Sequence, residues 1–310
     1  MKYLVLIFFL LGLTAVAAAD EMKFIEDKTQ GTLTIRGATG DVLTYRFGDQ
    51  LAEGLDPKHT RSGYIHPLFS LDGKSLTDDF PKDHLHHHGV FWTWPVVITR
   101  GQKTSSWETV SPPLRQHFVR WLKREQDGAT AVLSVENAWK LDGRETVARE
   151  TVTLRVHPAD GAGRAIDLEL EIEAVGGPLE LRGTPDQNKG YGGLCFRGAP
   201  LFTGAAMTTD QGVLKEDVTN TPFRWADLST SELGVAIFVS PGHPGFPTGW
   251  LIRNSYAGVL NPSWPGLKPV ILQPGQPIRL RYRIYVHRGD AAAAGVPQAY
   301  QRYISQAPHR

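Results

Sequence analysis

Apolar and polar residues alternate along much of the chain, and a period of two is typical of β-strands with one buried face. The clearest run covers residues 166–174, where isoleucine and leucine at even positions alternate with acidic residues. A second run, 278–286, alternates apolar and aromatic residues with Arg279, Arg281 and Arg283. If these two strands are neighbours, their acidic and basic faces form complementary cross-strand pairs.

Other runs separated by glycine and proline predict further strands, at 32–36, 42–47, 117–122, 131–136, 147–156, 234–239 and 250–253. Residues 234–239 are apolar on both faces, as in a strand that is covered on both sides. One helix is predicted, at 291–306, near the end of the chain. The pattern therefore predicts an all-β fold, a large antiparallel sandwich of two sheets with a short C-terminal helix.

The N-terminal segment has the layout of a secretory signal peptide. Lys2 precedes an apolar run over residues 3–18, which ends in Ala17-Ala18-Ala19. A transmembrane anchor is the alternative, but the run is short and no cationic cluster follows it. We expect residues 1–19 to be removed and 20–310 to form a single β-sandwich domain, either periplasmic or secreted. No later segment has 18 consecutive apolar residues, so no membrane span is expected in the mature chain.

Composition narrows the class of partner. Lys and Arg number 33 against 32 Asp and Glu, and removal of Lys2 leaves the two signs equal. This balance argues against nucleic acid as the main partner, because nucleic-acid binding requires a basic surface. A hydrophobic content of 41% indicates a folded protein. The single cysteine, Cys195, excludes an internal disulfide, and its apolar neighbours indicate a packed thiol.

A histidine cluster is the most distinctive motif. It runs Asp83-His84-Leu85-His86-His87-His88-Gly89, and in extended chain His84, His86 and His88 share one face. Histidine is the usual proton-transfer group near neutral pH, so His84, His86 and His87 are candidate catalytic residues. Alternatively, His84 and His86 bind a divalent metal together with the upstream His66. A purely structural loop remains the third reading.

Glu150 is the anomaly of the strand 147–156. Alternation places it on the inward, apolar face, where a carboxylate is costly unless it is paired or opens onto a cleft. We expect Glu150 to be a catalytic acid or a partner of the histidines, unless a strand end releases it to solvent.

Aromatic residues near turns, including Trp92 and Trp107, are typical of carbohydrate-binding surfaces, where rings stack on the apolar faces of sugars. A glycine-rich loop at 187–193 permits close backbone approach. Six residues are candidate substrate-binding groups: His66, Asp83, Trp92, Arg197, His243 and Arg253. The hydrolase elbow, the Walker loop, the dinucleotide fingerprint and the HExxH motif do not occur in the sequence.

The segments Tyr64-Ile65-His66-Pro67-Leu68 and 78–89, with Gly192-Gly193-Leu194-Cys195-Phe196-Arg197, resemble a bacterial family that carries the name methane oxygenase PmoA. The resemblance extends over nearly the whole mature chain. It matches Asp83, His84, His86 and His87, whereas Leu85 and His88 replace the proline and the arginine of the family motif. The membrane subunit of that name is a helical multi-spanning protein, so the resemblance instead implies an exported sugar-pathway protein. The strand pattern is similar to galactose-mutarotase-like supersandwiches.

Together these observations predict an exported carbohydrate-active protein that acts by acid/base elimination or epimerisation in a histidine-lined cleft. One of the histidines would be the base, Glu150 the acid and Arg197 the anchor of a substrate oxygen. The partner would be a small sugar or an oligosaccharide, and the sequence identifies no cofactor apart from the divalent metal of the alternative reading. Two alternatives stay open: a divalent-metal-dependent sugar-modifying enzyme, and a non-catalytic carbohydrate-binding protein.

Overall fold

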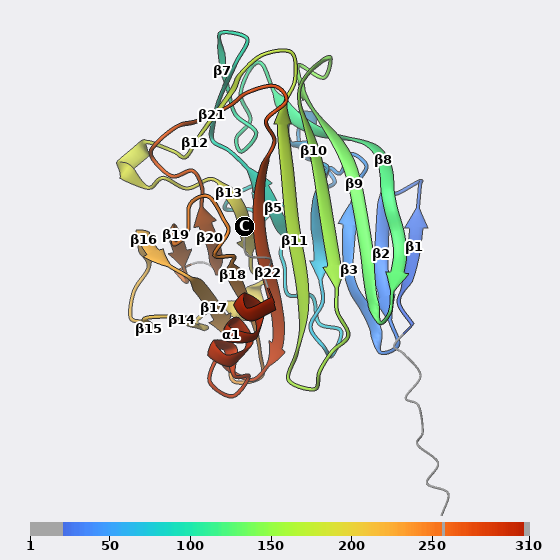
Figure 1. Cartoon of the computed structure of the whole chain (residues 1–310), viewed down its shortest axis with the longest axis vertical. Coiled ribbons are helices and arrows are strands. Elements are labelled where there is room, and N and C mark those ends of the chain that lie inside the picture. The colour runs from blue at the N-terminus through green and yellow to red at the C-terminus, as the bar shows by residue number, and fades with distance from the viewer. Residues whose placement is uncertain (1–20, 256–257, 307–310) are drawn as a thin grey trace, which may run out of the picture.

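The computed structural model describes residues 21–255 and 258–306. The predicted signal peptide, residues 1–19, lies outside the described residues and stays a prediction. Within the described residues the structure is built from antiparallel β-strands and one short α-helix, which confirms the predicted all-β class. Two nine-stranded sheets lie face to face, and a third sheet of four strands lies at one end of the molecule (Figure 1).

Sheet 1 has, in spatial order, β1 (Lys23–Asp27), β2 (Thr32–Gly37), β3 (Gly40–Arg46), β4 (Tyr64–Leu68), β5 (Val90–Thr93), β13 (Gly193–Arg197), β20 (Val259–Ser263), β19 (Thr248–Arg253) and β16 (Val218–Phe223). Sheet 2 has β15 (Gly212–Leu214), β14 (Ala206–Thr209), β17 (Trp225–Ser229), β18 (Leu233–Val239), β22 (Ile278–Arg288), β11 (Gly163–Ala174), β10 (Glu145–Val156), β9 (Thr130–Leu141) and β8 (Leu114–Asp127). Sheet 3 has β21 (Val270–Leu272), β12 (Leu179–Arg182), β6 (Val96–Thr99) and β7 (Gln102–Thr104). The helices are α1 (Val296–Gln306) and three 3₁₀ turns, at Pro57–His59, Asp186–Asn188 and Pro200–Phe202.

The two strands with opposite charge are neighbours, which the sequence left as a condition. In the register of β11 and β22, Asp167, Glu169 and Glu171 on the outer face each lie opposite an arginine. Three ion pairs follow, each with an N···O distance of 2.6 Å: Asp167–Arg283, Glu169–Arg281 and Glu171–Arg279. Exposed pairs of this kind contribute little stability individually. They do penalise a one-residue slip, which would bring charged side chains to the core face.

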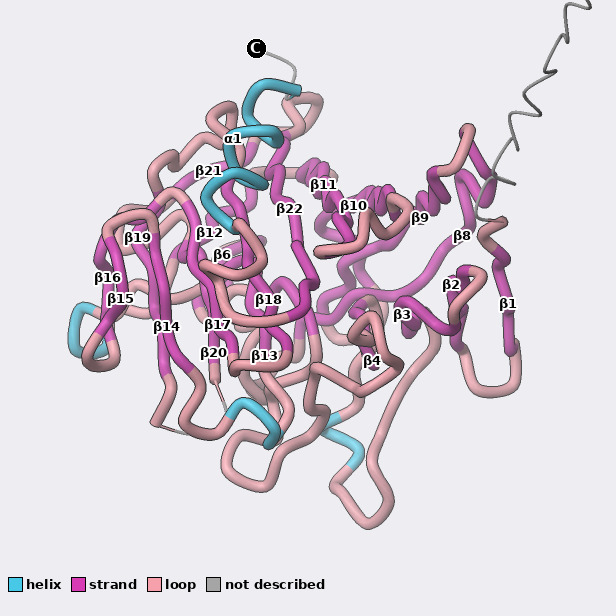
Figure 2. Tube along the Cα trace, turned by 90° about the horizontal axis from the view of Figure 1, so that it is seen from below, coloured by secondary structure: helices cyan, strands magenta, loops and turns pink. Residues whose placement is uncertain are grey.

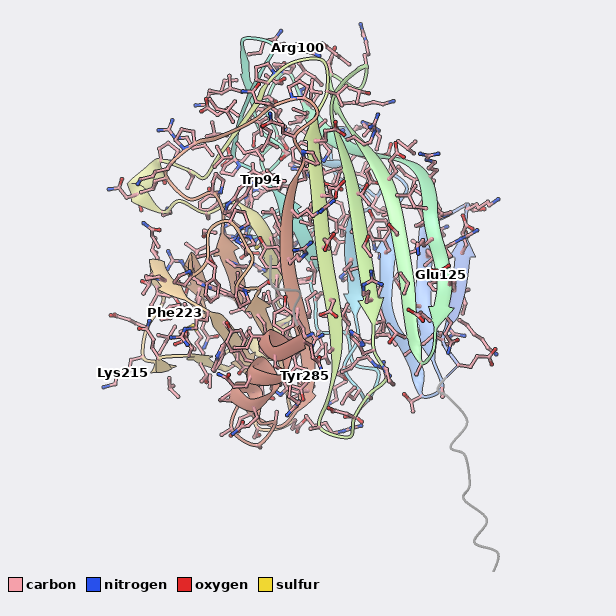
Figure 3. The ribbon with its side chains drawn as sticks, in the orientation of Figure 1. Trp94, Arg100, Glu125, Lys215, Phe223 and Tyr285 are labelled. Carbon is pink, nitrogen blue, oxygen red and sulfur yellow. The ribbon has the colours of Figure 1, made fainter. Side chains whose placement is uncertain are left out.

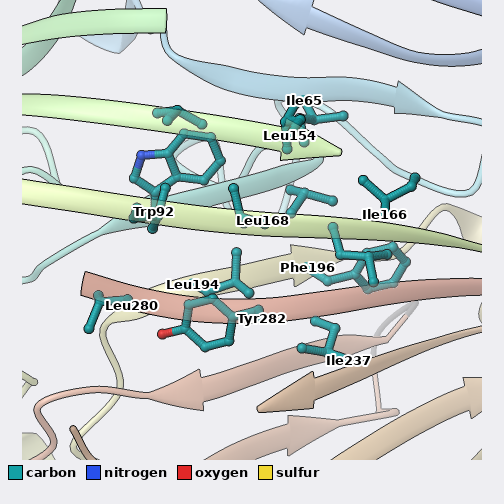
Figure 4. Close-up of a cluster of buried hydrophobic side chains, with 14 of the residues drawn as sticks. Ile65, Trp92, Leu154, Ile166, Leu168, Leu194, Phe196, Ile237, Leu280 and Tyr282 are labelled. Carbon is teal, nitrogen blue, oxygen red and sulfur yellow. The ribbon is translucent and has the colours of Figure 1, made fainter. Parts of the chain in front are cut away.

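The main core fills the space between sheets 1 and 2. Figure 4 shows Trp92 and Leu194 of sheet 1 among Leu168, Leu280 and other apolar side chains of sheet 2. Because side chains alternate along a strand, their neighbours in the chain project from the opposite face of sheet 1. A second apolar cluster lies there, formed by Tyr64, Phe91, Trp107, Cys195, Leu251 and Val259.

Helix α1 covers part of the outer face of sheet 2, over β17, β18 and β22 (Figure 2). It packs Tyr300 and Tyr303 against Phe238 of β18 and lies close to Tyr285 of β22 (Figure 3). This cover explains why residues 234–239 are apolar on both faces. The helix begins five residues later than predicted, because the segment 291–295 forms turns instead. The Asp290 carboxylate accepts hydrogen bonds from the backbone N–H groups of Ala292 and Ala293 in these turns. No helix among the described residues is long and apolar enough to cross a membrane.

Candidate active site

The histidine cluster folds into two consecutive tight turns between β4 and β5. The His84 N–H donates to the Pro81 carbonyl at 3.0 Å, and the His87 N–H donates to the His84 carbonyl at 2.8 Å. The extended arrangement expected from the sequence is therefore wrong. The turns stack the rings of His84 and His87, with centroids 4.6 Å apart, and place the ring of His86 edge-on to both. His88 leaves the group and is buried elsewhere.

Gly89 allows this loop to lie against β4. A Cβ atom at this position would lie 2.1 Å from the Ile65 carbonyl oxygen, well inside van der Waals contact. The backbone approach requires a residue without a side chain. Glycine thus fixes where the histidine turns enter β5.

The three histidines His84, His86 and His87 line one pocket on the outer face of sheet 1, away from the main core. Its volume is about 130 Å³. The other lining residues come from two loops and from β19 and β20: Trp107, Lys189, Tyr191, Leu251, Arg253 and Val259. Segments distant in sequence thus converge on the histidine turns, as is usual for ligand sites.

A chain of hydrogen bonds orients His84. Its Nδ1 lies 3.0 Å from Oδ2 of Asp83, and Nη2 of Arg197 donates to both oxygens of Asp83, at 2.9 and 3.0 Å. Partial burial raises the pKa of Asp83, but the hydrogen bonds from His84 and Arg197 outweigh it, so this pKa lies below its usual range. A carboxylate that holds Nδ1–H leaves Nε2 of the imidazole as the basic atom.

Arg197 has a different position from the predicted one. Its side chain is only 3% exposed and contacts Asp83, and it does not line the pocket. We expected Arg197 to contact a substrate oxygen. In the structure it instead contacts Asp83, the residue that orients His84. Arg253 does line the pocket, held by a 2.9 Å hydrogen bond from its Nη2 to Oγ1 of Thr219.

His86 and His87 are neutral in this environment. Burial lowers the pKa of His86 to about 4, and the nearby His84 lowers it further in the same direction. Burial also lowers the pKa of His87 well below its usual value. Neutral imidazoles accept as well as donate hydrogen bonds, so the pocket presents both functions to a ligand at neutral pH.

Two buried nitrogen atoms in the pocket residues have no hydrogen-bond partner among the described residues: Nδ1 of His87 and Nε1 of Trp107. The two side chains are 5% and 2% exposed, and their ring centroids are 5.8 Å apart. Leaving a buried donor or acceptor unpaired costs about 1–3 kcal/mol, so these atoms mark a place where a ligand group would be stabilised.

His66 is partly buried and belongs to a hydrogen-bond network outside the pocket lining. Its Nδ1 lies 3.0 Å from Oγ1 of Thr77, and it does not line the pocket. In the same network, Asp79 accepts a hydrogen bond from Tyr64 at 2.9 Å and lies 2.7 Å from Nδ1 of His88. Among the described residues, no group of three or more His, Cys, Asp or Glu is placed to hold a metal ion. The predicted metal set of His84, His86 and His66 is therefore not assembled in this geometry.

Glu150 lies on the other side of sheet 1, inside the main core. It is fully buried and accepts hydrogen bonds from Nε1 of Trp92 at 3.0 Å, Nε1 of Trp139 at 2.9 Å and Nδ2 of Asn137 at 2.9 Å. The inward orientation predicted from alternation is confirmed. The structure does not bring Glu150 or Trp92 to the histidine pocket, so neither is placed to contact a ligand there.

His243 is also turned into the core. Its Nε2 lies 2.8 Å from the Tyr282 hydroxyl, and Gly245 donates its N–H to Nδ1 at 3.1 Å. With both ring nitrogens engaged between the sheets, His243 is a structural residue and does not reach the pocket. Lys189 and Tyr191 were not among the predicted site residues, although the glycine-rich loop 187–193 that carries them was the available signal.

The buried histidines predict a loss of stability in acid. Burial lowers the pKa of His66 and of His86 to about 4 and that of His243 to about 3. At a pH between these values and the ordinary histidine pKa of about 6.5, the unfolded chain therefore binds more protons than the folded chain. The stability that the neutral histidines contribute is complete above this ordinary pKa and is lost as the pH falls below it. We expect the free energy of unfolding to drop between pH 7 and pH 4.5. In His86→Asn this drop should be smaller by roughly 1–2 kcal/mol, as measured by urea titration at both pH values. An equal drop in the variant would contradict the assignment of a neutral His86.

The fold and this site define a class: an antiparallel two-sheet β-sandwich with a histidine-lined pocket on the outer face of one sheet. The chain belongs to the Family of unknown function (DUF6807), whose model matches residues 15–301. The name methane oxygenase PmoA stays a resemblance taken from the sequence. A comparison with curated proteins gave no match.

Among solved structures, the chain is similar to a galactose mutarotase related enzyme from Lactobacillus acidophilus, with a TM-score of 0.41 and 6% identity, covering 86% of this chain and 97% of that chain. It is also similar to a proposed aldose 1-epimerase from Klebsiella pneumoniae, with a TM-score of 0.26 and 12% identity, covering 91% of this chain and 83% of that one. Both TM-scores are low, so these likenesses bear on neither the site nor the reaction.

Proposed function

We propose that this protein is an enzyme that acts on a carbohydrate by general-base chemistry in the histidine pocket. The observation that carries the proposal is the chain from Arg197 through Asp83 to His84, which ends at the pocket. A base oriented by a second, fixed group is the arrangement that proton-transfer sites use. Export remains part of the proposal, on the pattern of residues 1–19.

In the proposed reaction, Nε2 of His84 takes a proton from a sugar carbon next to a carbonyl group. The electron pair of the broken C–H bond forms a C–C double bond, and the carbonyl oxygen becomes an enolate oxygen. Arg253 and Lys189, the two cations that line the pocket, stabilise this negative charge. A proton from water added to the opposite face gives an epimer, and His84 releases the abstracted proton to solvent. Alternatively, a β-substituent departs with the electron pair of its bond and takes the proton from His84, which gives an unsaturated product.

Sugar recognition is assigned to the aromatic and unpaired groups of the pocket. The rings of Trp107 and Tyr191 contact each other, with centroids 5.0 Å apart, and offer an apolar surface to a sugar face. A hydroxyl group both donates and accepts, so one hydroxyl satisfies Nε1–H of Trp107 and a deprotonated Nδ1 of His87 together. Neutral histidines suit this task better than charged ones, since imidazolium only donates.

The test is a reaction screen in deuterium oxide. Purified protein is incubated with oxidised and uronic monosaccharides and their disaccharides, and products are analysed by mass spectrometry and NMR. We expect one solvent deuterium on the carbon of an epimerised sugar, or an unsaturated sugar after elimination. If sugars of the panel bind, but none exchanges a carbon-bound proton or changes, the enzymatic proposal fails and a binding protein remains.

A further inference from the structure

We propose that the substrate extends beyond the histidine pocket into a second subsite, which holds a second, neutral sugar unit. This inference rests on the function proposed above and adds the size and charge of the substrate. It starts from a second, larger cavity of about 790 Å³, next to the first. The cavity is lined by Pro95, Val96, Lys103, Thr104, Ser105, Glu108, Val110, Thr184, Pro185, Asp186, Gln187 and Tyr191.

The two cavities share a wall. Tyr191 lines both, and its partner Trp107 lines the histidine pocket, between Ser105 and Glu108 of the outer cavity. The same two loops, 103–110 and 184–191, therefore build both spaces. Pockets that enclose whole small ligands have volumes of about 300–1,000 Å³. The histidine pocket alone is smaller than this range, whereas the outer cavity falls within it.

The loop that separates the cavities is closed on itself. Thr184 donates its N–H to the Tyr191 carbonyl at 3.0 Å, and Gly190 donates its N–H to the Thr184 carbonyl at 2.9 Å. Gln187 and Asn188 between them adopt left-handed backbone conformations, with φ of 48° and 56°. Non-glycine residues in this region cost energy and persist only where the surrounding structure holds them. The shared wall is thus preformed by the backbone of this loop.

The two cavities differ in charge. Both charged residues that line the histidine pocket are cations, Lys189 and Arg253. The outer cavity has the carboxylates of Glu108 and Asp186 in its lining, together with Lys103. Asp186 pairs with Lys189 at 3.2 Å and Arg253 lies 3.9 Å from Asp217, so the contrast is between the charged groups that line each space and not between unpaired charges. Carboxylates accept hydrogen bonds from sugar hydroxyls and repel an anionic group. The geometry therefore fits an acidic or oxidised unit beside the histidines and a neutral, hydroxyl-rich unit outside.

Calorimetric titration with matched sugars tests the second subsite. The probes are glucuronic and galacturonic acid, each compared with a disaccharide that joins the same acid to neutral glucose or galactose. We expect at least one disaccharide to bind about tenfold or more tightly than its acid. Val110→Trp, which fills the outer cavity, should reduce the affinity for that disaccharide to that of the monosaccharide and leave monosaccharide binding unchanged.

Val213→Trp is the matched control, because Val213 is 69% exposed on β15, in the other large sheet. Glu108→Ala removes a polar contact without adding volume and should weaken disaccharide binding but not monosaccharide binding. This second variant tests the subsite even if Val110→Trp does not fold. Equal affinities for the acid and all its disaccharides overturn the subsite while the proposed function stands. If wild-type protein binds neither kind of sugar, the proposed function fails, and the subsite with it.

Discussion

Replacement of His84 by alanine is expected to lower kcat/KM by at least about 100-fold, because a positioned general base typically contributes between ~10² and ~10⁴ in rate. His84 reaches the pocket with its side chain about one-third exposed, so its loss leaves the buried interior intact. Substrate affinity, measured by calorimetry, should change much less than turnover. Steady-state kinetics on the sugar identified by the screen gives both quantities.

His157→Ala is the matched control for this prediction. His157 also pairs with an aspartate, with Nε2 at 2.7 Å from Oδ2 of Asp167, and it has a similar exposure, but it directly follows β10 of sheet 2 and does not line the histidine pocket. Its replacement should leave turnover unchanged. Asp83→Asn should give an intermediate loss, because the imidazole remains but its orienting charge is gone. Turnover in His84→Ala within a factor of about three of wild type would contradict the assignment of His84 as the base.

The alternation of residue types was sufficient to predict the long strands. β11 and β22 were predicted because each has one apolar and one charged face. Their opposite charges were compatible with pairing but did not establish it, and the structure shows that the two strands are neighbours. Short strands such as β5 and β13 are buried on both faces, so they lack the alternation that reveals a strand. Helix α1 was predicted, and only its first residues were misplaced.

The sequence located the candidate site better than it predicted the geometry of that site. The motif at 83–89 marked the histidines that line the pocket, whereas their proton-transfer chemistry stays a prediction. Asp83 and Arg197 were both among the candidates. Their mutual contact joins residues 114 positions apart, which a single sequence does not reveal. The histidine turns were missed because the motif was treated as extended chain, whereas local bonds from His84 to Pro81 and from His87 to His84 form two turns. His243 was misjudged because its partner, Tyr282, lies 39 residues away in the sequence.

For Glu150 too, the sequence predicted the burial of the side chain but not its hydrogen-bond partners. Its inward position followed from the alternation within β10, but its main partners include Trp92 of the opposite sheet, 58 residues away in sequence. A buried carboxylate is a candidate for catalysis only if it opens onto a cleft. In this fold it instead accepts three hydrogen bonds within the core, so its replacement tests stability rather than catalysis.

Glu150→Ala is expected to destabilise the protein by at least about 4 kcal/mol. The side chains of Trp92, Trp139 and Asn137 would each lose their acceptor, at about 1–3 kcal/mol for each buried group left unpaired, and a cavity would remain. Denaturant titration measures this difference. A change below about 1 kcal/mol would show that the three donors find other partners.

Glu150→Gln separates this structural role from catalysis. The glutamine oxygen can accept from both indoles, which bond Oε2 of Glu150. Its amide then lies where Oε1 accepts from Nδ2 of Asn137, so the Asn137 amide has to turn over and present Oδ1, which is buried and has no partner among the described residues. We expect a change in stability of no more than about 1.5 kcal/mol and turnover within about threefold of wild type.

Burial raises the pKa of Glu150, and hydrogen bonds from Asn137 and the indoles offset this rise in part. The folded state thus holds this proton more tightly than the unfolded state, and the associated stability declines as the pH rises above about 4.3. That decline should be absent in Glu150→Gln, whereas a stable Glu150→Gln variant without turnover would return Glu150 to the catalytic site.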